Sequence, residues 1–161
     1  MIFGALFVVV LLFGMVVFFG APYLPTMKPQ SRAAIEMIGL KPGDTIIELG
    51  SGDGRVARRM AIAGYRVVGY ELNPILVIVS IFITWKYRKN IRIVWGNFWK
   101  QDWPEARGVY VFLLDRYMQK LNMKLESYAS RNGPVRVASY AFKIPDKKPR
   151  KHKNGVYLYQ Y

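Results

Sequence analysis

Apolar and polar positions follow two alternating periods between residues 31 and 161. Short runs rich in Ile, Val and Tyr are typical of buried strands, and longer segments between them carry apolar positions at helical spacing. The pattern predicts strands at 45–50, 65–71, 91–96, 109–115, 134–142 and 155–161. It predicts helices at 31–40, 55–64, 74–90 and 116–130, a loop or short helix at 97–108, and a basic loop at 143–154.

The alternation of strands with helices predicts an α/β fold with a mostly parallel sheet covered by helices on both faces. The two last strands follow one another without a helix, which predicts an antiparallel pair at one edge. Ligands of such sheets bind outside the carboxyl ends of the strands. The turn after the first strand is therefore the expected place for a ligand.

Residues 1–21 contain no charged side chain and reach the length of about 20 apolar residues that a membrane-spanning helix needs. A cleaved signal peptide and a buried core helix are the alternatives, but a basic n-region and a clear cleavage site are lacking. We therefore expect a transmembrane anchor at 1–21 followed by one domain at 22–161. Basic residues follow the segment and none precedes it, so the positive-inside rule predicts a single-pass protein whose domain lies on the cytoplasmic side.

A second apolar segment lies inside the predicted helix 74–90. Residues 75–85 are apolar on all sides, whereas helices on such sheets are usually amphipathic. The segment is too short to cross a bilayer. It is either fully buried or lies against lipid, with Lys86, Arg88 and Lys89 reaching the headgroups.

Charge and composition limit the kinds of partner that the chain can bind and the kinds of catalysis that it can perform. The chain has 24 Lys and Arg against 10 Asp and Glu, a net charge of +14, and all of these residues follow the apolar segment. Such a body is attracted to anionic lipid headgroups, and nucleic acid is the other natural partner. Cysteine is absent and the single histidine, His152, lies among basic residues, so we expect no metal site and no thiol or Ser-His catalysis.

The glycine-rich turn "ELGSGDGR" (48–55) does not fit a phosphate-binding motif. The dinucleotide fingerprint G-x-G-x-x-G needs glycine at position 55, where this chain has Arg55, and the third glycine comes early, at Gly54. A P-loop would need Gly-Lys-Ser/Thr, which is absent. Glu48 and Asp53 would also repel a pyrophosphate.

Two carboxylates at this turn suit a ligand with positive charge and hydroxyl groups. S-adenosylmethionine has a sulfonium, an ammonium and a ribose diol. Glu71 ends the second predicted strand, 23 residues after Glu48, close to the offset of an acid that binds ribose. Asn97 and Phe98 follow the third strand; the amide of Asn97 suits the edge of adenine and the ring of Phe98 suits its face. The alternative for Glu48, Asp53 and Glu71 is that they are solvated acids at the starts of loops. The predicted cofactor contacts are Glu48, Gly50, Ser51, Gly52, Asp53, Gly54, Glu71, Leu72, Asn97 and Phe98.

Together, "ELGSGDGR", "GYELNP" (69–74) and "PYLPT" (22–26) resemble the small class I S-adenosylmethionine-dependent methyltransferases. The similarity is to the FAM173-type mitochondrial lysine methyltransferases and the archaeal protein lysine methyltransferases related to Dot1. The resemblance implies a Rossmann-like methyltransferase fold over 22–161. It also implies that Tyr23 and Thr26 contact the methionine end of the cofactor, and that a lysine in the loop of a membrane protein, such as the ATP synthase c-ring, is one class of target.

Asp115 and Tyr117, after the fourth strand, do not match a motif of that family. We predict them as catalytic groups that attract the substrate ammonium and relay its proton, with Tyr140 as a further candidate. The alternative for the tyrosines is packing in the core or at an interface.

The sequence thus predicts a membrane-anchored, S-adenosylmethionine-dependent N-methyltransferase that acts on protein lysines near the membrane. Methylation of RNA, with residues 147–153 as a phosphate patch, and methylation of a lipid or small hydrophobic molecule remain open. A non-catalytic membrane-tethered scaffold with a vestigial cofactor site is the alternative outside enzymes.

Overall fold

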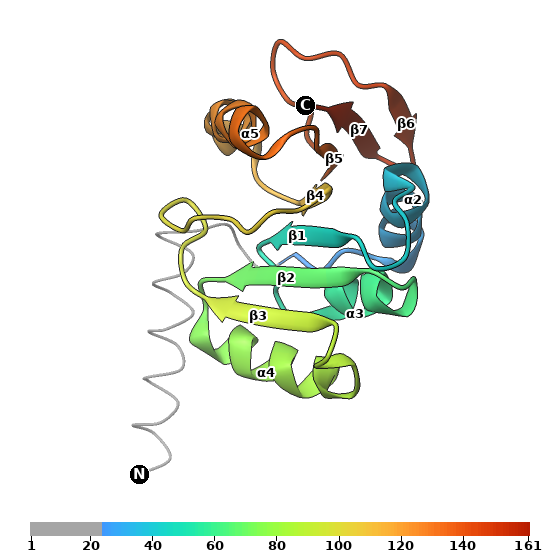
Figure 1. The fold of residues 1–161 in the computed structure, drawn as a ribbon, viewed down its shortest axis with the longest axis vertical. Coiled ribbons are helices and arrows are strands. Elements are labelled where there is room, and N and C mark those ends of the chain that lie inside the picture. The colour runs from blue at the N-terminus through green and yellow to red at the C-terminus, as the bar shows by residue number, and fades with distance from the viewer. Residues whose placement is uncertain (1–23) are drawn as a thin grey trace.

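The computed structural model describes residues 24–161 (Figure 1). Its helices are α2 (Lys28–Ile38), α3 (Arg55–Ile62), α4 (Pro74–Thr84) and α5 (Met118–Asn132), with 3₁₀ turns η1 (Trp85–Tyr87) and η2 (Asp115–Tyr117). Its strands are β1 (Thr45–Leu49), β2 (Arg66–Glu71), β3 (Ile91–Trp95), β4 (Gly108–Val111), β5 (Arg136–Tyr140), β6 (Lys151–Lys153) and β7 (Val156–Gln160).

All seven strands form one sheet in the order β3-β2-β1-β4-β5-β7-β6. Strands β1 to β5 are mutually parallel, and β7 pairs antiparallel with both β5 and β6. The strand order reverses between β1 and β4. The carboxyl ends of β1 to β5 therefore meet at one edge of the sheet. The point at which the strand order reverses, called the switch point, lies beside the glycine turn, where the sequence predicts a ligand.

Helices cover both faces of the sheet, as Figure 1 shows. Helices α2 and α3 pack on one face, where the core contains Ala34, Met60 and Tyr110. Helix α5 packs on the other face through side chains such as Leu121 and Leu125. Helix α4 lies beside α3 and contacts β2 and β3. The predicted α/β architecture with an antiparallel edge is confirmed.

Three element boundaries differ from the predictions by more than two residues. The first helix begins at Lys28 rather than at residue 31, so Ser31 lies inside its first turn. The Ser31 hydroxyl donates to the carbonyls of Met27 and Lys28. The predicted helix 74–90 ends at Thr84, and the strand predicted at 109–115 ends at Val111.

The predicted basic loop also contains a strand that was not predicted. Residues 151–153 form β6, which pairs with β7 at the edge of the sheet. All three of its side chains are exposed, so this strand carries no apolar alternation by which the sequence would reveal it.

Within residues 24–161, no helix is both long and apolar enough to cross a membrane. The anchor predicted at 1–21, the domain boundary that follows it and Tyr23 lie outside the described residues. All three stay predictions.

Gly54 sets how closely α3 approaches α4. Its φ of +79° lies in the left-handed region, and a Cβ there would collide with Ser80 Oγ of α4 and lie 3.0 Å from Thr84 Cγ2. Only glycine satisfies both the backbone conformation and the space. The glycine turn is thereby packed directly onto α4.

We predict that Gly54→Ala lowers the free energy of unfolding by about 2–4 kcal/mol, because backbone strain and overpacking add. Gly39→Ala is the matched control, since Gly39 also has a left-handed φ, +53°, but a Cβ there would meet no atom nearer than 3.5 Å. It should cost only about 1–2 kcal/mol, the backbone part. Denaturant titration measures both, and equal losses would show that the contact with Ser80 is unimportant.

Candidate cofactor site at the carboxyl edge of the sheet

The glycine turn leaves β1 in a conformation that only glycines adopt readily. Gly50, Gly52 and Gly54 have φ angles of +81°, +55° and +79°. The backbone amides of Gly50 and Ser51 both donate to the carbonyl of Tyr70, at 3.0 and 2.8 Å, which fixes the turn to the end of β2. The turn therefore places backbone without side chains at the open edge of the sheet.

Glu71 lies at the end of β2 and holds this turn from the side. Its Oε2 accepts from Gly52 N and its Oε1 from Asn73 N, each at 2.8 Å. Glu71 is buried. Each carboxylate oxygen has two acceptor positions, so one position on each oxygen remains for another donor. Two adjacent acceptor positions suit the two hydroxyl groups of a ribose.

Glu48 is buried under the turn, on the face that α3 covers. It is 2% exposed and accepts a hydrogen bond from the backbone of Ala57 near the start of α3, whereas its Oε2 has no partner among residues 24–161. Burial raises the pKa of Glu48 well above its ordinary value, and the negative charges of Asp53 and Glu71 raise it further. A buried carboxyl oxygen without a donor fits a cationic or hydrogen-bonding ligand.

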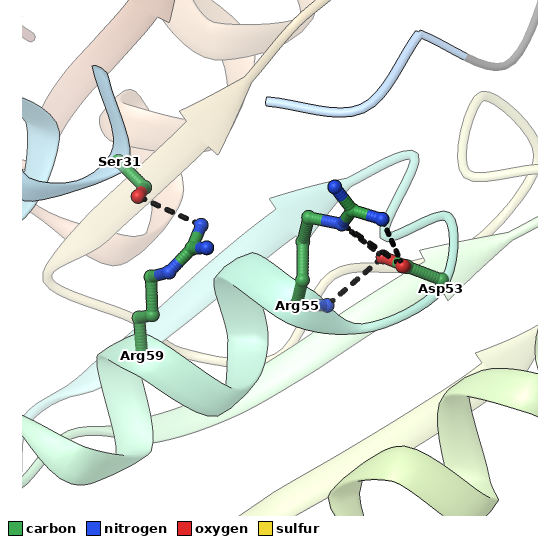
Figure 2. A network of polar contacts seen from close by, with 4 residues as sticks. All are labelled: Ser31, Asp53, Arg55 and Arg59. Atoms are coloured by element: carbon green, nitrogen blue, oxygen red, sulfur yellow. Dashed lines mark hydrogen bonds and ion pairs between the residues drawn. The ribbon is translucent and has the colours of Figure 1, made fainter. Parts of the chain in front are cut away.

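Asp53 is engaged by Arg55, as Figure 2 shows. Its Oδ2 lies 2.7 Å from Nη2 of Arg55, and its Oδ1 accepts from Nε and from the backbone amide of the same residue. Arg55 thus neutralises much of the charge of Asp53. The structure places Asp53 at the start of α3, where it supports the turn more than it offers charge to a ligand.

Two polar contacts connect α2 and Thr26, which precedes α2, to the cofactor site. The sequence did not predict either contact. Thr26 Oγ1 lies 2.9 Å from the hydroxyl of Tyr110 on β4, and both residues are buried. Arg59 Nη1 of α3 donates to Ser31 Oγ at 2.9 Å (Figure 2). Burial raises the pKa of Tyr110, although the hydrogen bond between Tyr110 and Thr26 acts to lower this pKa. A tyrosine within an apolar strand looks like an ordinary core residue, so no sequence signal marks it.

The loop after β3 carries the predicted adenine contacts. The Oδ1 of Asn97 accepts from Trp99 N at 3.0 Å, so the side chain stabilises a turn. Its amide nitrogen and the second acceptor position of Oδ1 can still bind a ligand. Phe98 is half-buried and packs on Trp99, with ring centroids 4.7 Å apart. Leu72, next to Glu71, is half-buried, and its carbonyl accepts from Trp95 Nε1.

The predicted catalytic residues lie in η2, directly after the chain leaves β4. Asp115 is exposed, and Tyr117 is half-buried with its ring 6.2 Å from that of Trp99. The guanidinium of Arg116 lies over the Tyr117 ring at 4.9 Å. Both residues therefore belong to the same sheet edge as the glycine turn, but neither is hydrogen-bonded to Glu48 or Glu71 within residues 24–161.

The arrangement fits S-adenosylmethionine better than a phosphate or a metal. The turn offers backbone, Glu48 offers an unpartnered buried oxygen, and Glu71 offers acceptors for hydroxyl groups. Among residues 24–161, no cluster of three or more His, Cys, Asp or Glu side chains is arranged to hold a metal ion. Fold and site together define the class of Rossmann-like methyltransferases.

Comparison with known proteins agrees with this class. The profile of the ANTKMT methyltransferase domain family matches residues 48–151, so the chain belongs to this family. An ATP synthase C-subunit lysine N-methyltransferase from Xenopus laevis is 32% identical over 78% of this chain and 55% of its own length. A protein-lysine N-methyltransferase from Saccharolobus islandicus is 32% identical over 86% of this chain and 92% of its own length. The chain spans little more than half the length of the Xenopus relative.

Solved structures support the fold and the cofactor. An RNA methyltransferase from Salinibacter ruber, crystallised with S-adenosyl-L-homocysteine, superposes with a TM-score of 0.74 at 28% identity, covering 86% of this chain and 92% of its own. S-adenosylmethionine is thus the cofactor, as predicted, and the predicted methyltransferase family is confirmed. The individual contacts remain assignments from the geometry above.

The raised pKa of Glu48 predicts a pH dependence of stability. An acid whose pKa is higher in the folded state contributes stability fully below its unfolded pKa of about 4.3, and this is lost as the pH rises through the folded value. We expect the free energy of unfolding of the native chain to fall relative to that of Glu48→Gln over that interval. Denaturant titrations at several pH values measure the difference. Parallel curves for the two proteins would mean that Glu48 titrates normally.

Proposed function

We propose that this chain is a membrane-anchored, S-adenosylmethionine-dependent methyltransferase whose acceptor is a protein lysine at the membrane surface. The observation that carries the proposal is the set of buried acids at the switch point: Glu48 Oε2 lacks a partner in the described part of the chain, and Glu71 holds the glycine turn. The names of the Xenopus and Saccharolobus relatives support lysine as the acceptor.

The charge of the chain favours a tethered enzyme. A body with a net charge of +14 repels lysine-rich proteins in solution and attracts anionic lipid headgroups. An anchor at 1–21 would hold the domain, on the cytoplasmic side, close to lysines in loops of membrane proteins. The enzyme would then select its substrate because the anchor holds the site near these lysines, and not because their charge attracts them to the domain.

The described residues have separable tasks in this reaction. The cofactor supplies an electrophilic methyl group on a sulfonium. Glu71 orients the ribose hydroxyls, and Glu48 offers its free oxygen to a donor or a cation under the turn. Holding acceptor and methyl group in line accounts for most of the acceleration of such a displacement. The lysine must reach the site as a neutral amine, so we assign to the Asp115 carboxylate the acceptance of its proton, with the Tyr117 hydroxyl as a relay.

Methylation of RNA is the second candidate, because the Salinibacter ruber protein is titled an RNA methyltransferase. A basic pocket supports it, with a volume of about 580 Å³ and Lys41, Arg107, Arg136 and Arg150 in its lining. This pocket lies beside the amino ends of β1, β4 and β5, at the edge opposite the glycine turn. It would hold phosphates far from the reacting atoms.

Glu71→Gln should weaken binding of S-adenosylmethionine about 10- to 100-fold, as expected for loss of hydrogen bonds to a charged acceptor. The change also sets a side-chain NH₂ against Gly52 N or Asn73 N, two groups that themselves donate. Calorimetric titration of the full chain in detergent, with S-adenosylmethionine and with S-adenosylhomocysteine, measures the effect. Asp53→Asn is the comparison and should weaken binding less, because Arg55 already engages Asp53. Equal affinities for Glu71→Gln and the native chain would refute the ribose assignment.

Asp115→Asn and Tyr117→Phe should lower kcat by about 10²-fold if they relay the proton, with the dissociation constant of the cofactor unchanged. Glu105→Gln, an exposed acid in the loop before β4, is the matched control and should leave kcat unchanged. Transfer of radiolabelled methyl groups to membrane fractions measures the rates. Protease-sensitive label that resists ribonuclease supports lysine, and ribonuclease-sensitive label would establish the RNA alternative instead.

A further inference from the structure

Helix α4 buries Leu76 and Val77 together with its only two hydroxyl side chains, and it exposes most of its large apolar side chains. Its two hydroxyl side chains, Ser80 and Thr84, are buried against the body of the protein. Its outward side is formed by large apolar residues, namely Ile78, Val79, Ile81, Phe82 and Ile83, which are all exposed. Helices that face water show the opposite arrangement. Full burial, one of the two alternatives open from the sequence, is thereby excluded for this segment within the described structure.

This apolar side is long and continuous. Phe82 is 83% exposed and Ile78 69%, one turn apart on the same side of the helix. Of the described elements, α4 lies outermost at the β3 side of the molecule (Figure 1). An apolar patch of this kind marks a contact with a partner or a membrane.

Residues at both ends of α4 identify the partner as lipid. Trp85 follows the helix and is 60% exposed, and Trp95, whose Nε1 donates to the carbonyl of Leu72 just before the helix, is 65% exposed. Exposed tryptophans that bracket an apolar helix are typical of the membrane interface. Three basic residues follow at the carboxyl end of the helix, Lys86, Arg88 and Lys89. The Arg88 guanidinium lies 4.9 Å from the Trp85 ring.

We propose that the outer side of α4 is a membrane-docking surface that lies flat in the headgroup region of an anionic bilayer. Ile78 and Phe82 enter the boundary of the acyl chains, Trp85 and Trp95 sit at headgroup level, and the basic residues after α4 bind lipid phosphates. α4 carries no acidic residue that would oppose this contact. The inference goes beyond the proposed function, since it depends neither on the cofactor nor on the acceptor.

The docking surface would also orient the site. Helix α4 starts three residues after Glu71, at the edge of the sheet where β1 and β2 end, so its amino end marks the position of the glycine turn. With α4 flat on the bilayer, this edge faces sideways, along the membrane plane. The site then lies at the height of lysines that emerge just above the headgroups.

The test uses the absence of cysteine from the chain. Phe82→Cys and, as control, Met123→Cys are each labelled with an environment-sensitive fluorophore in the full chain, reconstituted into vesicles with and without anionic lipid. Met123 is exposed and apolar but lies on α5, on the opposite face of the sheet. Both positions are exposed, so neither change disturbs the core, and thermal unfolding checks this.

In anionic vesicles the label at position 82 should shift its emission to shorter wavelength and lose at least about half its intensity to a lipid carrying a shallow spin label. The label at 123 should do neither. Purely zwitterionic vesicles, or the variant Lys86→Gln/Arg88→Gln/Lys89→Gln, should reduce the quenching at 82.

Three results would overturn the inference. In the first, the label at position 82 stays in water although flotation shows that the protein is bound to the vesicles. In the second, the label is shielded from water but not quenched by the lipid, as would happen if residues 1–23 covered the helix. In the third, the shielding disappears when the protein is diluted among the vesicles, as would happen if a second copy of the protein covered the helix. Cofactor titration in detergent is unaffected by each of these. Failure of the docking surface and failure of the proposed function are therefore distinguishable.

Discussion

The carboxylate of Glu71 is the contact on which the arrangement of the site depends. One oxygen holds Gly52 in the turn after β1, and the other holds Asn73, whose side chain in turn caps α4 by accepting from Ile75 N and Leu76 N. A single buried acid thus fixes both the glycine turn and the first turn of α4. Because α3 then packs on α4 at Gly54, the position of the site and the direction of α4 are set together.

The acids of the site differ in their environments, although the sequence presents them as equivalents. Asp53 is paired with Arg55, and Glu71 accepts two backbone hydrogen bonds. Glu48 has a raised pKa and one oxygen without a partner in the part of the chain that the structure describes. Only a folded chain distinguishes them, since burial and partners decide the charge of each. In a chain of net charge +14, this small buried acidic cluster is the exception, and it marks where a cationic ligand is favoured.

Much of the fold was predictable because it depends on local alternation. The order of strands and helices up to β5, the antiparallel β7 and the acids at the strand ends follow from apolar periods and turn residues. Features set by long-range contacts were not predictable. The contact of Thr26 with Tyr110 joins positions 84 residues apart. The strand β6 consists of three residues with exposed side chains, and its backbone pairs with β7.

Helix α4 is the element whose surroundings could least be predicted from the sequence. An apolar helix has the same composition whether protein or lipid surrounds it, so periodicity alone leaves both open. The difference lies in which side carries the few polar residues. Ser80 and Thr84 face the protein, where the Thr84 hydroxyl donates to the carbonyl of Ser80, and this leaves the outward side without any polar group. A protein that stayed in water would gain by exchanging the two sides. The chain does the reverse at the helix whose start Glu71 fixes, so the proposed membrane-docking surface and the cofactor site share one piece of backbone.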